Sequence, residues 1–241
     1  MSANAPTHGD SVKADPVKVY GIVEAVNFCY AVGVNARYAS WDATMASNQI
    51  ESLIDRKAWK SAQSAIKKEL DHEPDDHWLW SRLSGVKYEQ RDYSGALDAA
   101  KKALEIVPDC PLALWSYASA LDGLGKTKEA GKIYIQLLRR GVEELNRPDD
   151  DADECWEGAE WTRRLVMDCI FCLAATLPKI GMPERAATWY RRFLDLLHLG
   201  MPPGTFSRED ARARLEKLAG TKNGSATYSM ESEITEVEAL M

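Results

Sequence analysis

The sequence predicts an all-α fold, an array of antiparallel helix pairs closed by capping helices. The first observation is a repeat, because Ala62, Ala96 and Ala130 stand at one constant interval along the chain. Leucine and proline recur at the same interval, at Leu70, Leu104, Leu138, Pro74 and Pro108. The second observation is that stretches such as ALDAAKKAL place apolar residues three and four apart, which marks one face of a helix. A fixed period of about 34 residues is typical of stacked helix–turn–helix units rather than of a globule with one core.

Composition and charge exclude several classes of protein. The chain has 241 residues, of which 45% are apolar and 28% charged, as in ordinary water-soluble proteins. Its net charge of −7 argues against nucleic acid and anionic membranes as partners. The five cysteines lack the spacing of a disulfide framework, so we expect a reduced, cytoplasmic setting. The first residues do not resemble a secretory signal, and no apolar run reaches about 18 residues, so we expect no membrane insertion.

The N-terminal part divides into two segments. Residues 1–14 are polar and are expected to be flexible. Residues 15–42 are expected to form a helical segment, opened by Pro16 at a position where proline suits a first helical turn. A strand is the alternative, because three valines between residues 17 and 23 are β-branched. The all-helical context favours the helix.

Three units follow, at residues 43–76, 77–110 and 111–144. The second unit resembles the tetratricopeptide repeat family, whose pattern is a Trp, then Leu-Gly, then Tyr, and later Ala, an aromatic residue and Pro. It carries the family's residue types at Trp80, Leu83, Tyr93, Ala96, Ala103, Leu104 and Pro108. It departs from the pattern at Ser84 and Lys87. The resemblance implies a right-handed superhelical array of antiparallel pairs, a solenoid.

The outer units keep fewer of these residues. The third unit retains the alanines and Tyr134, but has Val142 in place of proline. The first unit retains Trp59 and Pro74, and its first helix departs from the pattern. Physical reasoning supports the stacking independently, because a short helical pair exposes an apolar side unless a neighbour covers it.

An acidic insert, residues 145–166, separates the third unit from a fourth. Its aspartate-rich part is expected to be a solvated loop, with attraction of a basic partner as the alternative. A helix is expected to start at about Asp153. Residues 167–220 then contain a fourth helix pair and a capping helix, with Ser207 as its N-cap and Gly220 as its stop. Residues 221–241 are expected to be a flexible acidic tail, in which a few apolar residues could form a short docking helix.

No catalytic motif and no cofactor-binding motif is found in the sequence, so we expect no enzyme, no cofactor and no metal. The pair Cys169 and Cys172 has the spacing of a redox or metal site, but no second pair exists and helical cysteines usually fill a core. The turn that contains His72 and His77 resembles a ligand cluster, but a polar turn between units explains it, and we favour that interpretation over metal binding.

The resemblance also implies a site. In this family the second, fifth, ninth and twelfth positions of each unit's first helix line the concave face, and this spacing places them on one side of a helix. The second and third units provide Trp78, Ser81, Gly85, Tyr88, Leu112, Trp115, Ser119 and Asp122. The first unit provides Thr44, Ser47, Glu51 and Ile54. Trp80 stands at the family's packing position instead. We therefore expect an aromatic groove, unless the N-terminal segment or the insert covers it.

Some relatives clamp a peptide's terminal carboxylate with Lys, Asn and Arg, and this clamp is expected to be absent. The corresponding positions hold Ser47, Glu51, Arg82, Leu112 and Ser116. The resemblance then implies a non-enzymatic scaffold that binds a peptide or protein segment through aromatic and small residues. The alternative is a chaperone or assembly factor that shields an apolar segment of a secreted or complex-bound subunit. Self-assembly into a homo-oligomer through the repeat ends is compatible with both.

Overall fold

The computed structural model describes residues 41–147, 155–156, 158–218 and 230–240. The chain divides into two compact units, residues 1–34 and 35–241, and every described residue belongs to the second. The expectations for residues 1–14 and for most of 15–42 therefore lie outside the described residues. Among the described helices, none combines the length and the apolar character needed to cross a membrane.

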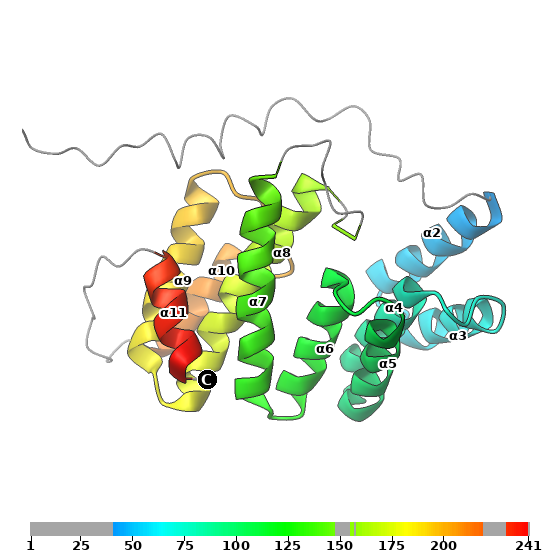
Figure 1. Cartoon of the computed structure of the whole chain (residues 1–241), viewed down its shortest axis with the longest axis horizontal. Helices are drawn as coiled ribbons and strands as arrows, with labels where there is room; N and C mark the ends of the chain where they lie inside the picture. Colours follow the sequence, from blue (N-terminus) through cyan, green and yellow to red (C-terminus); the bar gives the residue numbers. More distant parts are fainter. Residues whose placement is uncertain (1–40, 148–154, 157, 219–229, 241) are drawn as a thin grey trace, which may run out of the picture. The chain divides into compact units, whose positions relative to one another are not determined.

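The described residues form an all-α structure without strands, which confirms the predicted fold class at this level (Figure 1). The helices, in chain order, are α2 (Trp41–Asp55), α3 (Trp59–Leu70), α4 (His77–Glu89), α5 (Tyr93–Ile106), α6 (Pro111–Gly123), α7 (Thr127–Leu145), α8 (Ala159–Thr176), the short 3-10 helix η3 (Leu177–Ile180), α9 (Pro183–His198), α10 (Arg208–Lys217) and α11 (Met230–Leu240). Each α-helix from α2 to α9 packs against the next one along the chain, and α4 also packs against α6.

The three predicted units coincide with the pairs α2–α3, α4–α5 and α6–α7. The repeated alanines, Ala62, Ala96 and Ala130, are each 0% exposed, as expected where two helices approach closely. Both helices of the second unit, α4 and α5, have an aspartate as N-cap. Asp76 accepts hydrogen bonds from the backbone N–H groups of the first turn of α4, and Asp92 does the same for α5.

The fourth pair, α8 and α9, also forms, but its first helix begins later than expected. The sequence predicts a start near Asp153, whereas α8 begins at Ala159. Gly158 precedes it with a φ of 87°, a left-handed backbone that cannot lie within a helix. The bend before this glycine carries Trp156 into the core, where it is 5% exposed and meets Trp161 edge-on at 6.1 Å.

The capping helix α10 forms as the sequence predicts. Ser207 and Asp210 make a reciprocal capping box at its N-terminus. Ala211 is fully buried, and α10 packs against α9. The helix ends at Lys217, a little before the predicted glycine stop.

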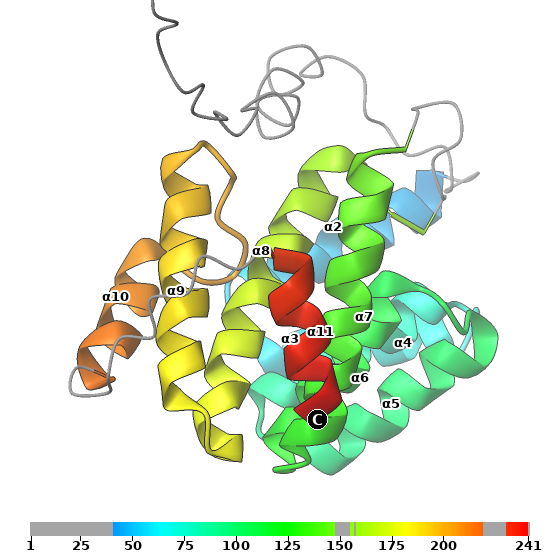
Figure 2. The same ribbon diagram turned by 60° about the vertical axis from the view of Figure 1, so that its left-hand side comes forward.

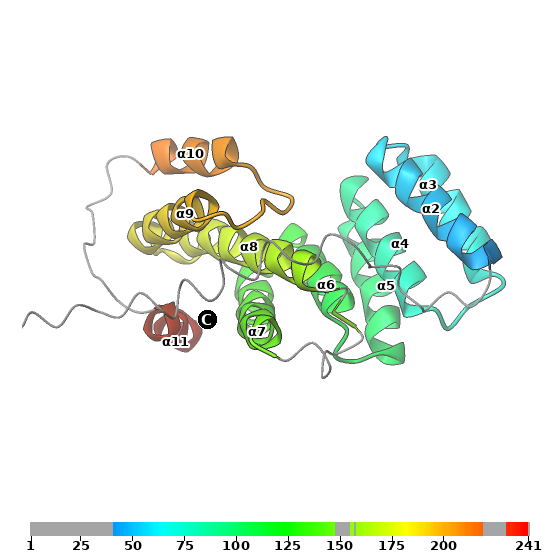
Figure 3. The same cartoon turned by 90° about the horizontal axis from the view of Figure 1, so that it is seen from above.

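The end of the chain differs from the expected flexible tail, because residues 230–240 form α11. This helix packs against α7, as Figures 2 and 3 show. Ile234 and Val237 are buried there, and Arg139 of α7 forms ion pairs with Glu231 and Glu238. The apolar spacing of three residues supplies the face that α7 covers, so the chain docks its own tail segment.

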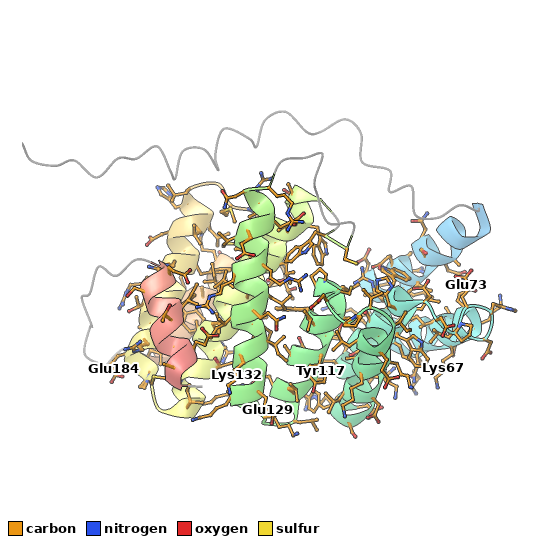
Figure 4. The ribbon with its side chains drawn as sticks, in the orientation of Figure 1. Lys67, Glu73, Tyr117, Glu129, Lys132 and Glu184 are labelled. Carbon is orange, nitrogen blue, oxygen red and sulfur yellow. The ribbon has the colours of Figure 1, made fainter. Side chains whose placement is uncertain are left out.

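Charged side chains cover the outer helices. Figure 4 labels Lys67, Glu73, Glu129, Lys132 and Glu184, all of which are exposed on α3, α7, α9 and the turn after α3. Three buried clusters lie among the described helices, the smallest of them around Cys110. Another joins α2 to α5, and the largest extends from α6 to α11.

Candidate functional site, a cavity lined by three helices

A cavity of about 510 Å³ lies along one side of α4, α6 and α8. Further lining comes from Ile54 of α2, Trp59 of α3 and Arg214 of α10, so helices from across the described fold contribute to one space. Its walls mix aromatic rings, small residues and a few charges. This composition matches a site that holds a ligand by packing and orients it with sparse polar groups.

Seven of the eight residues predicted to line a groove in the second and third units lie on this cavity. They are Ser81, Gly85, Tyr88, Leu112, Trp115, Ser119 and Asp122. Of the four first-unit residues, Ile54 lines it as well. The spacing of three and four residues along α4 and α6 brings these side chains to the same face of each helix.

Trp78 is the exception, and it does not line the cavity. Its half-buried ring packs against both the α2–α5 cluster and a small cluster around Cys110. The Arg82 guanidinium lies over this ring at 5.2 Å. Trp80 packs against the same two clusters and donates its indole N–H to the Pro74 carbonyl at 2.7 Å. Trp78 and Trp80 therefore both pack against the same two clusters. The sequence analysis placed only Trp80 at a packing position and expected Trp78 to line the groove.

Aromatic contacts hold the cavity wall in place. The Trp115 ring meets the buried Tyr134 ring at 5.4 Å, and Tyr88 meets Tyr93 at 5.3 Å. Burial, and secondarily the nearby Asp122 carboxylate, raise the pKa of Tyr88 above its usual value. Tyr88 therefore presents a neutral hydroxyl to the cavity at physiological pH.

Serine hydroxyls tie the lining helices together. Ser84 donates to the Ala96 carbonyl at 2.8 Å, which joins α4 to α5. Ser84 stands where the family has glycine, and its hydroxyl is satisfied at the close helix contact. Ser116 donates to the Ser81 carbonyl at 3.4 Å, which joins α6 to α4. The first bond joins the two helices of one unit, and the second joins neighbouring units, so both buried hydroxyls are satisfied at helix contacts.

The connection between α9 and α10 contributes Thr205 and Phe206 to the lining of the cavity, which sequence reasoning missed. Phe206 stacks on Phe171 of α8 at 4.0 Å between ring centroids. The buried Asp168 carboxylate accepts hydrogen bonds from the Thr205 backbone N–H at 2.8 Å and from its hydroxyl at 2.8 Å. A Cβ at Gly204 would collide with Asp168 Oδ1, so a larger residue there would force this carboxylate to move.

The Asp168 carboxyl is electrostatically unusual. Burial raises its pKa to about 6, even though the hydrogen bonds from Thr205 favour the ionised form. Desolvation therefore exceeds the stabilisation from hydrogen bonding. The carboxyl loses its proton only near neutral pH, and this part of the wall is anchored by a group that titrates within the physiological range.

Two ion pairs lie at the cavity. Lys179 of η3 donates to both oxygens of Asp122, at 2.7 and 2.8 Å, and links η3 to α6. Arg82 Nε lies 2.6 Å from Glu51 Oε1, without the angles of a hydrogen bond, and links α4 to α2. These pairs hold opposite charges together at the site, and the second pair occupies two of the positions, Glu51 and Arg82, at which the tetratricopeptide resemblance would place a carboxylate clamp.

The two sequence pairs considered for metal or redox chemistry occupy different surroundings. Cys169 is fully buried in α8, and burial raises the pKa of its thiol well above the usual value. Cys172 lines the cavity, and burial raises the pKa of its thiol as well. His72 is exposed in its turn. Among the described residues that line the cavity, none belongs to a converging group of potential metal ligands.

Sequence reasoning missed the lining residues that lie outside the three repeat units. Lys179, Thr205, Phe206 and Arg214 come from segments without the repeat period, so no phase could place them. One usable signal was the apolar run LVMDCIFC in α8. A helix that is apolar all round is buried, and a lone aspartate within it needs partners from elsewhere.

Comparison with models of protein families finds no match for this chain, and comparison with curated proteins finds no relative either.

Proposed function

We propose that this chain is a non-enzymatic tetratricopeptide-type scaffold that binds a peptide or protein segment in the cavity along α4, α6 and α8. One observation carries the proposal. Residues chosen by repeat phase in two separate units, from Ser81 to Asp122, line one cavity together. The repeated alanines buried at each helix contact, and the packing of consecutive helices, support a solenoid array as the scaffold.

The chemistry of the cavity favours an apolar or aromatic side chain as the main anchor. Trp115, Tyr88 and Phe206 offer ring faces, and Gly85 and Ser119 leave space between them. The charges of Asp122 and Arg82 are already paired with Lys179 and Glu51, so they are poorly placed to clamp a free carboxylate. We expect a segment held by packing, in an extended or helical form, rather than a charged chain terminus.

Gly85 provides the sharpest test, because a Cβ at this position meets nothing within 4 Å and the residue lines the cavity. Peptides selected from a random display library on the parent protein would be titrated against Gly85→Gln, whose side chain extends into the space. We expect at least about tenfold weaker binding, since a blocked anchor pocket removes central contacts. Ser64→Gln, on exposed α3, is the matched control and should bind like the parent.

Trp115→Ala is the complementary variant, because it removes an anchor instead of filling the space. We expect a loss of about 2 kcal/mol in binding free energy, or roughly thirtyfold in affinity. Melting temperatures of all variants would be measured beside the affinities. If peptides selected on the parent bind Gly85→Gln and Trp115→Ala with parental affinity, the cavity is not the binding site.

A further inference from the structure

Three potential metal ligands from distant parts of the chain converge outside the cavity. His77 begins α4, Cys110 is the N-cap of α6, and Cys155 lies in the connection before α8. Their ligand atoms all lie within 4.8 Å of one another. In a tetrahedral zinc site with Zn–S of about 2.3 Å and Zn–N of about 2.0 Å, ligand atoms are roughly 3.5–3.8 Å apart. Only small movements would therefore close the three groups around one ion.

The burial of these three residues and their apolar neighbours are suited to binding a cation. Cys110 is 1% exposed and packs with Trp78, Trp80 and Trp161, whereas His77 and Cys155 are half-buried. An apolar shell around sulfur and imidazole ligands limits access of water and strengthens the attraction between thiolate and cation. Because His77 and Cys155 are partly exposed, water can reach the group and serve as a fourth ligand.

The backbone also contributes. The N–H groups of Leu112 and Ala113, in the first turn of α6, approach the Cys110 sulfur, where they could donate to a metal-bound thiolate. These N–H groups help to fix the position of the Cys110 sulfur, as hydrogen-bond donors do for the ligands of zinc sites. Each of the three ligands belongs to a different helix or connection, so an ion would join segments that the chain order keeps apart.

We propose that His77, Cys110 and Cys155 bind one zinc-class divalent cation, with the fourth coordination position open to water. Two sulfur ligands and one imidazole are the donor types that zinc prefers. The cation would fasten the connection between α7 and α8 onto the starts of α4 and α6. Its role is therefore structural, and it is independent of what the cavity binds.

This set differs from the pairs considered in the sequence. His77, Cys110 and Cys155 are widely separated along the chain, so they form no short ligand motif. Cys169–Cys172 and His72–His77 have the spacings that suggest ligands, yet only His77 of these four joins a converging group among the described residues. The fold, and not local spacing, selects the ligands.

The test uses the full chain, reduced and stripped of metal, titrated with Co²⁺ without oxygen. We expect one equivalent to bind with the thiolate charge-transfer and d–d absorption bands of a tetrahedral site, and Zn²⁺ to displace it. Zn²⁺ should also raise the melting temperature above that measured with chelator. The variants Cys155→Ser and His77→Ala should weaken binding by at least about tenfold, since even changes outside the ligand set of zinc sites do so.

Two matched variants serve as controls, His72→Ala for the imidazole and Cys172→Ser for the thiol. Both should keep the cobalt bands and the zinc-dependent rise in melting temperature. Circular dichroism of each variant verifies that it folds. Cobalt absorption spectra are compared only among variants that fold like the parent. The proposal is overturned if the reduced parent gives no tetrahedral cobalt spectrum, or if the spectrum survives Cys155→Ser and His77→Ala. It is also overturned if thiol counting shows that Cys110 and Cys155 form a disulfide, and the protein still binds no metal after this disulfide is reduced.

Discussion

Single small residues decide how closely the helices approach. Ala96 is 0% exposed, and its carbonyl accepts the Ser84 hydroxyl at 2.8 Å, so α4 and α5 meet with no space between them. Gly85, one residue further along α4, is exposed and faces open space. In α4, therefore, Ser84 packs against α5, whereas the neighbouring Gly85 leaves the cavity open.

Enlarging Ala96 tests the packing role. We expect Ala96→Leu to lower the free energy of unfolding by about 1–3 kcal/mol, because a larger side chain must push α4 and α5 apart. Urea unfolding monitored by circular dichroism would measure the change. Ala213→Leu, on the exposed side of α10, is the control and should leave stability nearly unchanged. Equal stability of Ala96→Leu and the parent would show that the helix contact lies elsewhere.

Gly85 leads to the opposite expectation. Gly85→Ala should stabilise the protein by about 0.5–1 kcal/mol, because alanine loses less backbone entropy in a helix and its Cβ meets no neighbour here. The same unfolding measurement would detect the gain. A destabilised Gly85→Ala variant would mean that the space beside this residue is filled.

At the scale of elements, segments without the repeat period complete the structure. The connection between α9 and α10 lines the cavity through Phe206, and Asp168 of α8 holds this connection through Thr205. The helix α11 covers α7 through Ile234 and Val237. Both segments dock onto the helix pairs through a few specific contacts, which makes each of them testable by one substitution.

The anchor at Asp168 predicts a pH dependence of stability. Its pKa is about 6 in the folded protein against 3.8 for an unperturbed carboxyl. Between these values the folded state holds the extra proton, so this group's contribution to stability is complete below about pH 4 and is lost as pH rises through about 6. Relative to Asp168→Asn, which does not titrate, the parent should therefore lose stability over this interval.

Urea unfolding of the parent and Asp168→Asn at several pH values would measure that difference. The Asn side chain can still accept the Thr205 backbone N–H, so the connection should remain docked. A difference between the two proteins that stays constant from about pH 4 to pH 7 would contradict the raised pKa of Asp168.

The docking of α11 predicts a local effect. Val237 is 0% exposed against α7, so Val237→Asp should detach the helix and cost about 1.5–3 kcal/mol, the value of one buried aliphatic side chain. Hydrogen exchange of residues 230–240 would report the detachment. Ala239→Asp places the same charge on the exposed side of α11 and should leave the exchange slow. Equal exchange in both variants would indicate that α11 is not held by this face.

At the scale of the described part of the chain, stability is expected to be uneven. Residues 165–171 of α8 are all buried, and the largest core cluster extends over α6 to α11. Another cluster joins only α2 to α5. Where helices contact mainly their neighbours in the chain, opening begins at the end with fewer buried contacts and need not involve the rest.

Hydrogen exchange on the intact protein tests this expectation. Amides of α8 should exchange slowest, and amides of α2 and α3 should exchange fastest among the helices from α2 to α9, because α2 packs mainly on α3. Mass spectrometry of peptic fragments gives the necessary resolution. Equal exchange rates for α2 and α8 would show that the described helices unfold as one cooperative unit.

Much of the local structure could be predicted from residue types and spacing alone. The constant repeat interval located the pairs α2–α3, α4–α5 and α6–α7, because helix periodicity and small contact residues are local properties. The tetratricopeptide resemblance selected seven residues of one cavity, and their spacing of three and four explains why they share a helix face. Ser207 and Asp210 likewise predicted the helix cap that they form.

The sequence by itself thus determined that helices form, where the repeated pairs begin, and which residues of α4 and of α6 share one helix face. Only the tertiary structure decided that Trp78 packs inward, that α11 docks on α7, and that Asp168 anchors the wall of the cavity. It alone brought His77, Cys110 and Cys155 together. The reason is physical: helix formation and capping depend on neighbours within about four residues, whereas burial and ligand convergence depend on residues tens of positions away, which no local pattern encodes.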